Sequence, residues 1–202
     1  MHRALAAFNQ TIADARSMTT LFDFLTASVP SPFSYDDLLR IQLVYAVSAF
    51  DKLIHELVRI GMVNSFLGAR TPTPKYKAET ISIEFHLTLV SATLPPPVSL
   101  FEQEVARKLK ILSFQDPKKV ADALSYIWDE KDKWQKIGTT MGMNADDART
   151  QLKLIVDRRN AIVHESDSDA LSVLKQPLSK DECRNVTDFI ESCGRAIYGL
   201  VI

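Results

Sequence analysis

The segment from residue 35 to 66 constrains the fold of this 202-residue chain more than any other. Its sequence, YDDLLRIQLVYAVSAFDKLIHELVRIGMVNSF, repeats apolar residues at the spacing of an α-helix, and the apolar arc is wide. Such a helix has to be covered by other elements on most of its sides. We therefore expect a long central helix inside a single all-α domain over residues 1–202.

Helix signals also cover most of the remaining chain. Besides the central helix, we expect helices over residues 2–26, 98–113, 117–136, 145–165 and 180–200. The expected N-terminal caps are Ser34, Asp116 followed by Pro117, Asn144, and a capping box made by Ser179 and Glu182. The stretches GARTPTPKYK and GTTMGMN are expected to be loops. Residues 1–30 would then form an N-terminal helix and linker ahead of the main bundle.

Residues 81–90 carry two conflicting signals. The sequence ISIEFHLTLV alternates apolar and polar residues, which is the period of a β-strand. The chain offers no convincing second strand, and a lone strand leaves its backbone groups unpaired. We favour a helix here and keep a short extended segment as the alternative.

The composition bounds the class of protein. Only 6 glycines are present, which disfavours a turn-rich all-β architecture, and the net charge of -1 leaves nucleic-acid binding to a local patch. Cys183 and Cys193 lie ten residues apart on one expected helix, about 15 Å and beyond disulfide reach. Free thiols, an N-terminus without a long apolar stretch and no membrane-spanning run of about 18 apolar residues together predict a cytoplasmic protein.

The helix expected at 145–165 carries an arginine in the middle of its own apolar stripe. The residues that share this arc of the helical wheel are Leu152, Ile155, Val156, Ile162 and Val163, with Arg159 near its centre. A guanidinium left unpaired in a core costs a large free energy. Arg159 therefore either reaches water or a carboxylate as a structural residue, or faces a cleft or a second subunit. In the second case Asn160 and His164, which stack four residues apart at the edge of the stripe, would line the same polar site.

The central helix offers a matching polar stripe. Ser48, Asp51 and His55 are spaced three and four residues apart and therefore share one side of that helix. Asp51 is the expected carboxylate partner of Arg159. The alternative is that Asp51 and His55 simply lie at the boundary with solvent.

Several other chemistries lack their sequence signals. The four histidines, His2, His55, His86 and His164, show no spacing typical of a metal site. The chain has no glycine-rich phosphate loop and no G-x-S-x-G nucleophile elbow. We therefore expect neither a metal nor a cofactor.

The order Arg159, Asn160, three further residues and His164, in a chain that is otherwise helical, resembles the motif of the HEPN superfamily. The stretch YAVSAFDKLIHELV also resembles the HEPN central helix, and SFQDPKKVADAL is similar to the RiboL-PSP branch. The resemblance spans about residues 35–200. It implies an antiparallel helical bundle that dimerises, so that the arginines and histidines of two motif helices form one composite cleft.

The same resemblance implies a function. Many HEPN proteins are metal-independent endoribonucleases, often toxins or antiviral effectors, in which the 2′-hydroxyl of RNA attacks the neighbouring phosphate. Carried onto this chain, Arg159 and His164 would be catalytic, and Asn160 would orient His164 or contact phosphate. Asp51 and Ser48 would support the site from the central helix, and Arg158 would steer RNA.

Two other functions stay open on the sequence alone. Some HEPN proteins are non-catalytic and serve as partner modules in defence or toxin–antitoxin systems, with an antitoxin or another defence protein as partner. The chain can also be a helical scaffold unrelated to the superfamily. An intact Arg159–His164 motif favours the endoribonuclease, whereas the sparse basic surface favours the partner module.

Overall fold

Helices make up almost all of the regular structure in the computed structural model, which describes residues 1–32, 34–164, 167 and 175–202. They are α1 (His2–Ser28), α2 (Asp37–Phe66), α3 (Pro74–Lys77), α4 (Ile83–Ser91), α5 (Pro97–Leu109), α6 (Pro117–Leu124), α7 (Lys133–Met141), α8 (Ala145–His164) and α9 (Lys180–Val201). The described residues contain no β-strand. The expected all-α fold is confirmed. Within this part of the chain, no helix combines the length and the apolar character needed to cross a membrane.

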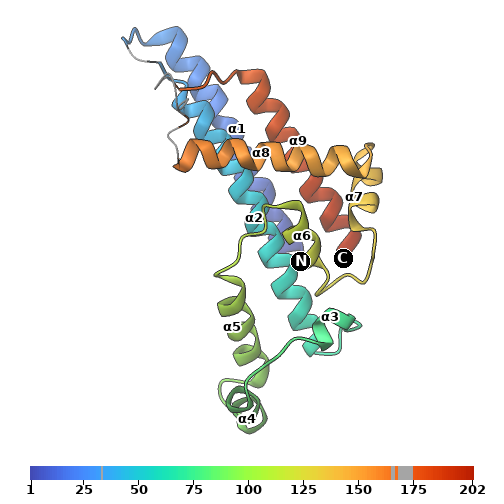
Figure 1. Ribbon diagram of the computed structural model, residues 1–202. Helices are drawn as coiled ribbons and strands as arrows, with labels where there is room; N and C mark the ends of the chain where they lie inside the picture. The colour runs from blue at the N-terminus through green and yellow to red at the C-terminus, as the bar shows by residue number, and fades with distance from the viewer. Residues whose placement is uncertain (33, 165–166, 168–174) are drawn as a thin grey trace.

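The long helix α2 is the centre of the bundle, as predicted. It packs against α1, α5, α6, α8 and α9. Figure 1 shows α1, α2 and α9 running alongside one another, with α8 crossing them and α5 lying beside the far end of α2. Phe50, Ile54 and Leu57 in the middle of α2 are 0% exposed, because neighbouring helices cover α2 on several sides.

Short-range signals define the last helix. The hydroxyl of Ser179 accepts a hydrogen bond from the backbone N–H of Glu182, and the Glu182 carboxylate accepts one from the backbone N–H of Ser179. This reciprocal pair satisfies two amide groups that the start of a helix otherwise leaves free. The predicted capping box is confirmed, and α9 runs from it along α1 and α2.

Both cysteines lie on α9, buried and free, as expected from their spacing. Burial raises the pKa of the Cys183 thiol to about 11 and that of Cys193 to about 12. Both thiols are therefore protonated near neutral pH, which rules them out as ready nucleophiles.

The single helix expected over residues 117–136 is wrong, because the chain forms two shorter helices there. Helix α6 ends at Leu124 in a tight turn, in which the backbone N–H of Ile127 bonds to the carbonyl of Leu124 at 2.9 Å. The indole of Trp134 then donates to the carbonyl of Pro117 at 2.8 Å and ties the start of α7 to the start of α6. This bond requires the chain to fold back between the two helices. As a result, α7 extends through most of the expected loop at 138–144.

Helix α4 covers Ile83–Ser91, so most of residues 81–90 are helical, which confirms the structure that we favoured and contradicts the extended alternative. The hydroxyl of Ser82 caps α4 by accepting a hydrogen bond from the N–H of Phe85 at 3.1 Å. Helix α4 packs against α5 with Leu89 buried, while other apolar residues of the alternating pattern, such as Ile83 and Leu87, are exposed to solvent.

Two smaller local predictions also need correction. The N-cap of α2 is Asp36 instead of Ser34, whose hydroxyl accepts a hydrogen bond from the N–H of Asp36 in the turn before the helix. The expected loop GARTPTPKYK contains the short helix α3, which Thr73 caps. Both differences are local and leave the bundle unchanged.

Gly194 tests how closely α9 packs on α1 and α2. A Cβ atom added at this position would lie 2.6 Å from Cζ of Phe8 and 3.1 Å from Cδ2 of Leu53. Phe8 is itself only 3% exposed and has little room to move. We expect Gly194→Ala to lower the free energy of unfolding by about 1–3 kcal/mol, because overpacking outweighs the better helix propensity of alanine.

Gly199→Ala on the same helix is the matched control. Nothing lies within 4 Å of the added Cβ there, so this change should raise the free energy of unfolding by about 0.5–1 kcal/mol. Denaturant unfolding measures both variants. Equal stabilities would contradict the close approach of α9 to Phe8.

Candidate functional site

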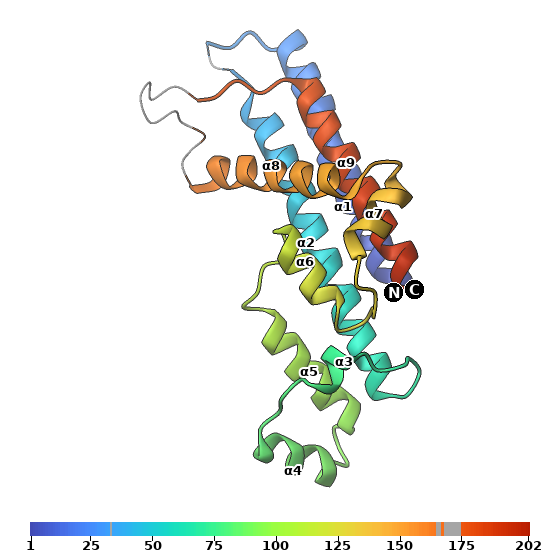
Figure 2. The same cartoon turned by 45° about the vertical axis from the view of Figure 1, so that its right-hand side comes forward.

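The half of α8 that carries the RNAIVH motif lies at the surface. The residues of α8 that are buried are Ala148, Leu152, Ile155 and Val156, all in the N-terminal part. Beyond them Arg159 and Ile162 are only half-buried, Val163 is 45% exposed and His164 is exposed. Figure 2 shows why: α8 crosses α2, and its C-terminal end projects past it. The apolar stripe of α8 thus continues from the core onto the surface at the motif.

An apolar surface surrounds the projecting half of α8. We call it the motif surface and define it by Ile41 and Tyr45 of α2 and by Ile162 and Val163 of α8. Ile41 is 39% exposed and Tyr45 is 45% exposed. A cavity of about 330 Å³ lies between Ile162 and the α2 residues. Exposed apolar side chains around a polar motif are typical of a surface that another molecule covers.

Arg159 has hydrogen-bonding capacity that the described residues do not use. Its Nη1 donates to Oδ1 of the neighbouring Asn160 at 3.0 Å. Its Nε is buried, and no hydrogen-bond acceptor among the described residues reaches it. A buried donor without a partner costs about 1–3 kcal/mol, and more in a charged group. Arg159 is therefore half-buried at the motif, with one buried donor for which the described residues supply no acceptor.

The spacing of Arg159 and His164 prevents one helix from directing both side chains at the same point. Five residues correspond to a rotation of about 140° and a rise of about 7.5 Å along an α-helix. Asn160 and His164, four residues apart, lie on one face instead. Arg159 and His164 therefore leave α8 in different directions.

The expected ion pair between Asp51 and Arg159 does not form among the described residues, and that prediction is wrong. Oδ1 of Asp51 accepts a hydrogen bond from the backbone N–H of Phe114 at 2.5 Å, and Oδ2 lies 3.6 Å from Nδ1 of His55. Nε2 of His55 lies 3.1 Å from the carbonyl oxygen of Leu109. Asp51 and His55 thus hold the linker between α5 and α6 against α2, where an unpaired backbone N–H would otherwise be left.

Ser48 is exposed on α2. Within the part of the chain that the structure describes, no hydrogen bond joins its side chain to the motif. Its role in supporting the site stays a prediction.

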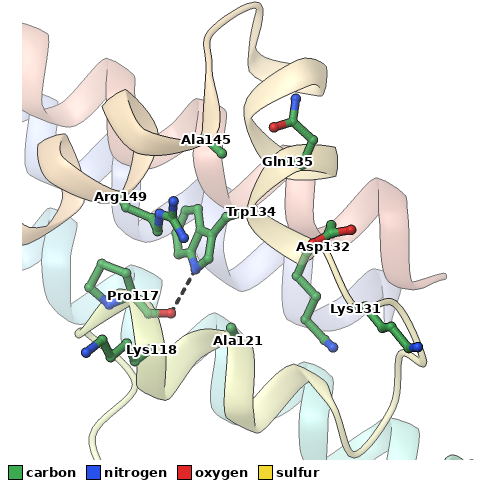
Figure 3. A pocket seen from close by; sticks show the side chains of 10 residues that line it. Pro117, Lys118, Ala121, Lys131, Asp132, Trp134, Gln135, Ala145 and Arg149 are labelled. Carbon is green, nitrogen blue, oxygen red and sulfur yellow. Dashed lines mark hydrogen bonds between the residues drawn. The ribbon is translucent and has the colours of Figure 1, made fainter.

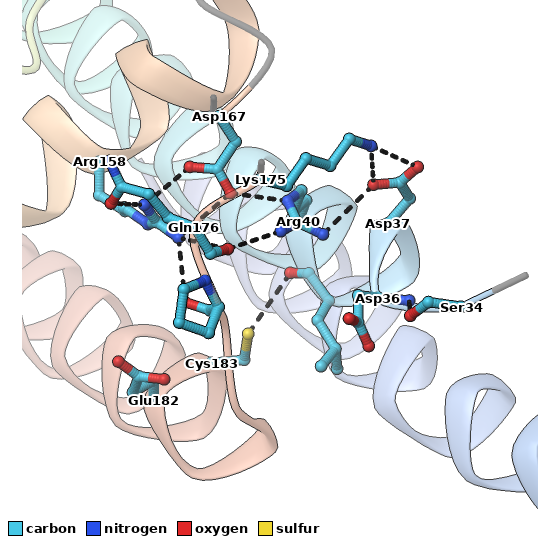
Figure 4. A network of polar contacts seen from close by, with 12 residues as sticks. Ser34, Asp36, Asp37, Arg40, Arg158, Asp167, Lys175, Gln176, Glu182 and Cys183 are labelled. Carbon is cyan, nitrogen blue, oxygen red and sulfur yellow. Dashed lines mark hydrogen bonds and ion pairs between the residues drawn. The ribbon is translucent and has the colours of Figure 1, made fainter. Parts of the chain in front are cut away.

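A buried ion-pair network, which the sequence did not reveal, holds the motif end of α8. The carboxylate of Asp167 is 0% exposed. Oδ2 accepts a hydrogen bond from Nε of Arg40, on α2, at 2.7 Å, and Oδ1 lies 2.7 Å from Nη1 of Arg158, on α8. Figure 4 shows the two guanidinium groups converging on this carboxylate, with the Gln176 carbonyl accepting hydrogen bonds from both. One residue thus joins α2, α8 and the segment before α9.

This network also fixes the backbone of the motif. The N–H of Asp167 donates to the carbonyl of Ala161 at 2.9 Å and satisfies one of the free carbonyls at the end of α8. Asp167 has a φ of 58°, in the left-handed region typical of helix C-terminal caps. Arg158, which we expected to steer RNA, has its guanidinium in this network, with about a fifth of the side chain exposed. Its part in RNA binding stays a prediction.

The outer edge of the network is a surface ion pair. Nζ of Lys175 lies 2.6 Å from Oδ1 of Asp37, and the same carboxylate oxygen lies 3.3 Å from Nη1 of Arg40. The hydrogen bond from Lys175 and the nearby charge of Arg40 hold the pKa of Asp37 below its ordinary value. Two carboxylates thereby offset the charges of three cations beside the motif surface.

One sequence signal for this network was available. Arg40 lies in the apolar stripe of α2 together with Leu43, Val47 and Phe50, at the same kind of spacing that drew attention to Arg159. An arginine in that position requires a buried anion. The sequence cannot identify the anion, because Asp167 is 127 residues away.

Among the residues that the structure describes, no group of three or more His, Cys, Asp or Glu side chains is placed to hold a metal ion. Comparison with protein families gives one match: the family model described as RiboL-PSP-HEPN covers residues 9–202. No curated protein and no solved structure matches the chain.

The Asp167 network predicts a specific loss of stability. Asp167→Asn keeps the shape of the side chain but leaves Arg40 and Arg158 without their buried counter-charge. We expect the free energy of unfolding to fall by about 3 kcal/mol, as when one partner of a buried ion pair is removed. Amide exchange at the C-terminal end of α8 should also become faster.

Asp181→Asn is the control, since that carboxylate is 83% exposed and pairs only with the exposed Arg184. Its effect should stay below about 0.5 kcal/mol. Chemical denaturation and hydrogen exchange followed by mass spectrometry measure the two effects. If Asp167→Asn proves as stable as this control, Asp167 does not anchor α8.

Proposed function

The chain belongs to the RiboL-PSP-HEPN family, and from that membership and the geometry of α8 we propose that it is a metal-independent endoribonuclease. The observation that carries the proposal is Arg159. It lies on the projecting half of α8, within the RNAIVH motif, with a buried Nε that has no acceptor among the described residues. The guanidinium is a permanently charged bidentate donor, the kind of group that binds phosphate oxygens in proteins.

The proposed reaction is attack of an RNA 2′-hydroxyl on the adjacent phosphorus. The new bond joins phosphorus to the 2′-oxygen, and the bond from phosphorus to the 5′-oxygen of the next nucleotide breaks. One imidazole accepts the proton of the 2′-hydroxyl, and a second donates a proton to the leaving oxygen. Arg159 stabilises the negative charge on the phosphorane, and Asn160 orients His164 or contacts the phosphate. The products are a 2′,3′-cyclic phosphate and a free 5′-hydroxyl.

The proposal requires a homodimer. One chain supplies a single His164, whereas the reaction uses both an acid and a base. The motif surface, with Ile41, Tyr45, Ile162 and Val163 half-buried or exposed, provides apolar area for a second copy. In a symmetric pair, the same surface of both protomers would meet and bring the two motifs together.

The biological role proposed with this activity is that of a toxin or an antiviral defence effector. The second candidate function is a non-catalytic partner module in a defence or toxin–antitoxin system. The motif surface favours it as well, because an antitoxin or another defence protein can cover the same exposed apolar side chains. The two functions differ in one measurable property, which is cleavage of RNA.

We predict that the wild-type protein cleaves single-stranded or loop RNA in the presence of EDTA. Unpaired RNA can adopt the in-line geometry that the attack needs, whereas an A-form helix resists it. His164→Ala should reduce the cleavage rate about 10²–10⁴-fold through loss of proton transfer. Arg159→Ala should reduce it about 10²–10³-fold through loss of charge stabilisation.

The matched controls are His86→Ala and Arg184→Ala, which remove a histidine and an arginine that are exposed on other helices. Both should cleave at the wild-type rate. Detection of the 2′,3′-cyclic phosphate by mass spectrometry identifies the reaction. Equal cleavage by wild type and His164→Ala, or none by either on varied RNAs, would refute the nuclease and leave the partner module.

A separate prediction concerns assembly. The wild-type protein should be a dimer at micromolar concentration, and Val163→Glu should make it monomeric and inactive, because a charge would be buried at the centre of the interface. Val163 is 45% exposed in the single chain, so the substitution should change the stability of the monomer little.

Leu154→Glu serves as the control, because Leu154 is 58% exposed on a different side of α8 from Val163. This variant should remain dimeric and active. Analytical ultracentrifugation gives the oligomeric state. A wild-type monomer that still cleaves RNA would rule out the composite site.

A further inference from the structure

A second cavity lies at the opposite end of α8 from the motif. Its volume is about 590 Å³, and it is formed where α6, α7 and the start of α8 meet (Figure 3). Its lining includes four cationic side chains, those of Lys118, Lys131, Lys133 and Arg149, and one carboxylate, that of Asp132. The lining therefore carries more positive than negative side chains, although the net charge of the whole chain is -1.

The cations of this cavity are only partly neutralised. Lys118 and Lys131 form no ion pair within the described residues, and Arg149 pairs with Asp146, a residue outside the lining. Lys133 is only 7% exposed, and its ammonium donates to the backbone carbonyl of Glu130. An ammonium has three donors, so Lys133 keeps hydrogen bonds to offer. Burial lowers the pKa of Lys133, which an anion bound beside it would counteract.

The aromatic residue of the cavity does not offer a stacking surface. Trp134 is only 6% exposed, and its indole N–H is bonded to the carbonyl of Pro117. Base stacking requires an accessible ring face. The chemistry of the cavity therefore suits a phosphate group, and the cavity offers no aromatic face on which a base can stack.

A polar stripe along α8 connects the cavity to the motif. It consists of Arg149, Lys153, Asp157, Asn160 and His164, spaced four, four, three and four residues apart, which places all five on one face of the helix. Each is exposed or half-buried. The rise from Arg149 to His164 is about 22 Å. Asp157 is the one carboxylate of the stripe, and Lys153 lies one turn before it.

We propose that this cavity binds the phosphate backbone of single-stranded RNA and that the polar stripe of α8 leads the strand from the cavity to His164. The proposal rests on the proposed endoribonuclease function and adds a second substrate contact to it. Because the cavity contacts phosphates and no bases, it strengthens binding of any sufficiently long strand without selecting its sequence.

The test is RNA binding by the double variant Lys118→Gln/Lys131→Gln, measured by fluorescence anisotropy in a His164→Ala background. We expect affinity for an RNA long enough to span the stripe to fall about tenfold, as for the loss of charged hydrogen bonds. The slope of log affinity against log salt should become shallower by roughly 0.7 for each cation removed.

Lys119→Gln/Lys136→Gln is the matched control. It removes two other exposed lysines, Lys119 on α6 and Lys136 on α7, without touching the cavity lining, and changes the net charge equally. This control should keep its affinity for long RNA. Equal affinities and salt slopes for the two double variants would overturn the proposal.

The binding assay also keeps the two proposals apart. It needs no cleavage, so its result on the cavity holds whether or not the wild-type protein is a nuclease. A protein that cleaves RNA but shows no cavity-dependent binding would keep the proposed function and lose the cavity. A protein that binds long RNA through the cavity but cleaves none would keep the cavity as a binding site and lose the proposed nuclease function.

Discussion

Burial of α2 is the constraint on which the rest of the structure depends. Half of its thirty residues are buried, and they point in several directions, so other helices have to cover it on several sides. Helix α8 contributes its buried residues up to Val156 to this cover, and Ile162 packs against the same core from the motif end. The last two turns of α8 thereby carry part of the apolar stripe and the polar motif at the surface.

Three arginines lie near the point where α8 crosses α2, and they differ in the partners that they have. Arg40 and Arg158 share the buried carboxylate of Asp167 and also bond to backbone carbonyls, so they have the partners that buried cations require. Arg159, the neighbour of Arg158, bonds only to the side-chain oxygen of Asn160 among the described residues, and its Nε is left without an acceptor. Arg40 and Arg158 thus have partners that hold the motif end of α8, whereas Nε of Arg159 has none among the described residues.

The sequence predicted those features that depend on local spacing. The apolar arc of α2, the capping box of Ser179 and the arginine within the stripe of α8 are all visible from residues within one or two turns of each other. The break between α6 and α7 was missed because a bond from Trp134 to Pro117 causes it, and no local signal reports that bond. The prediction that Asp51 pairs with Arg159 was wrong for a related reason. A helical wheel places residues on their own helix, but it does not give the rotation of that helix relative to its neighbours.

The distribution of charge along α8 links the two ends of the helix. Four cationic side chains line the cavity near Arg149, although the net charge of the whole chain is -1. Cations gathered in this way attract phosphate over about 8–10 Å at physiological salt. The motif end carries fewer free charges, because the cations beside it are largely committed to ion pairs. Capture of a strand at the cavity would therefore need no specificity, and the geometry around Arg159 and His164 would decide where the strand reacts. RNA binding and RNA cleavage would then take place at opposite ends of one helix. The Asp167 network would hold the motif end of that helix in place relative to α2.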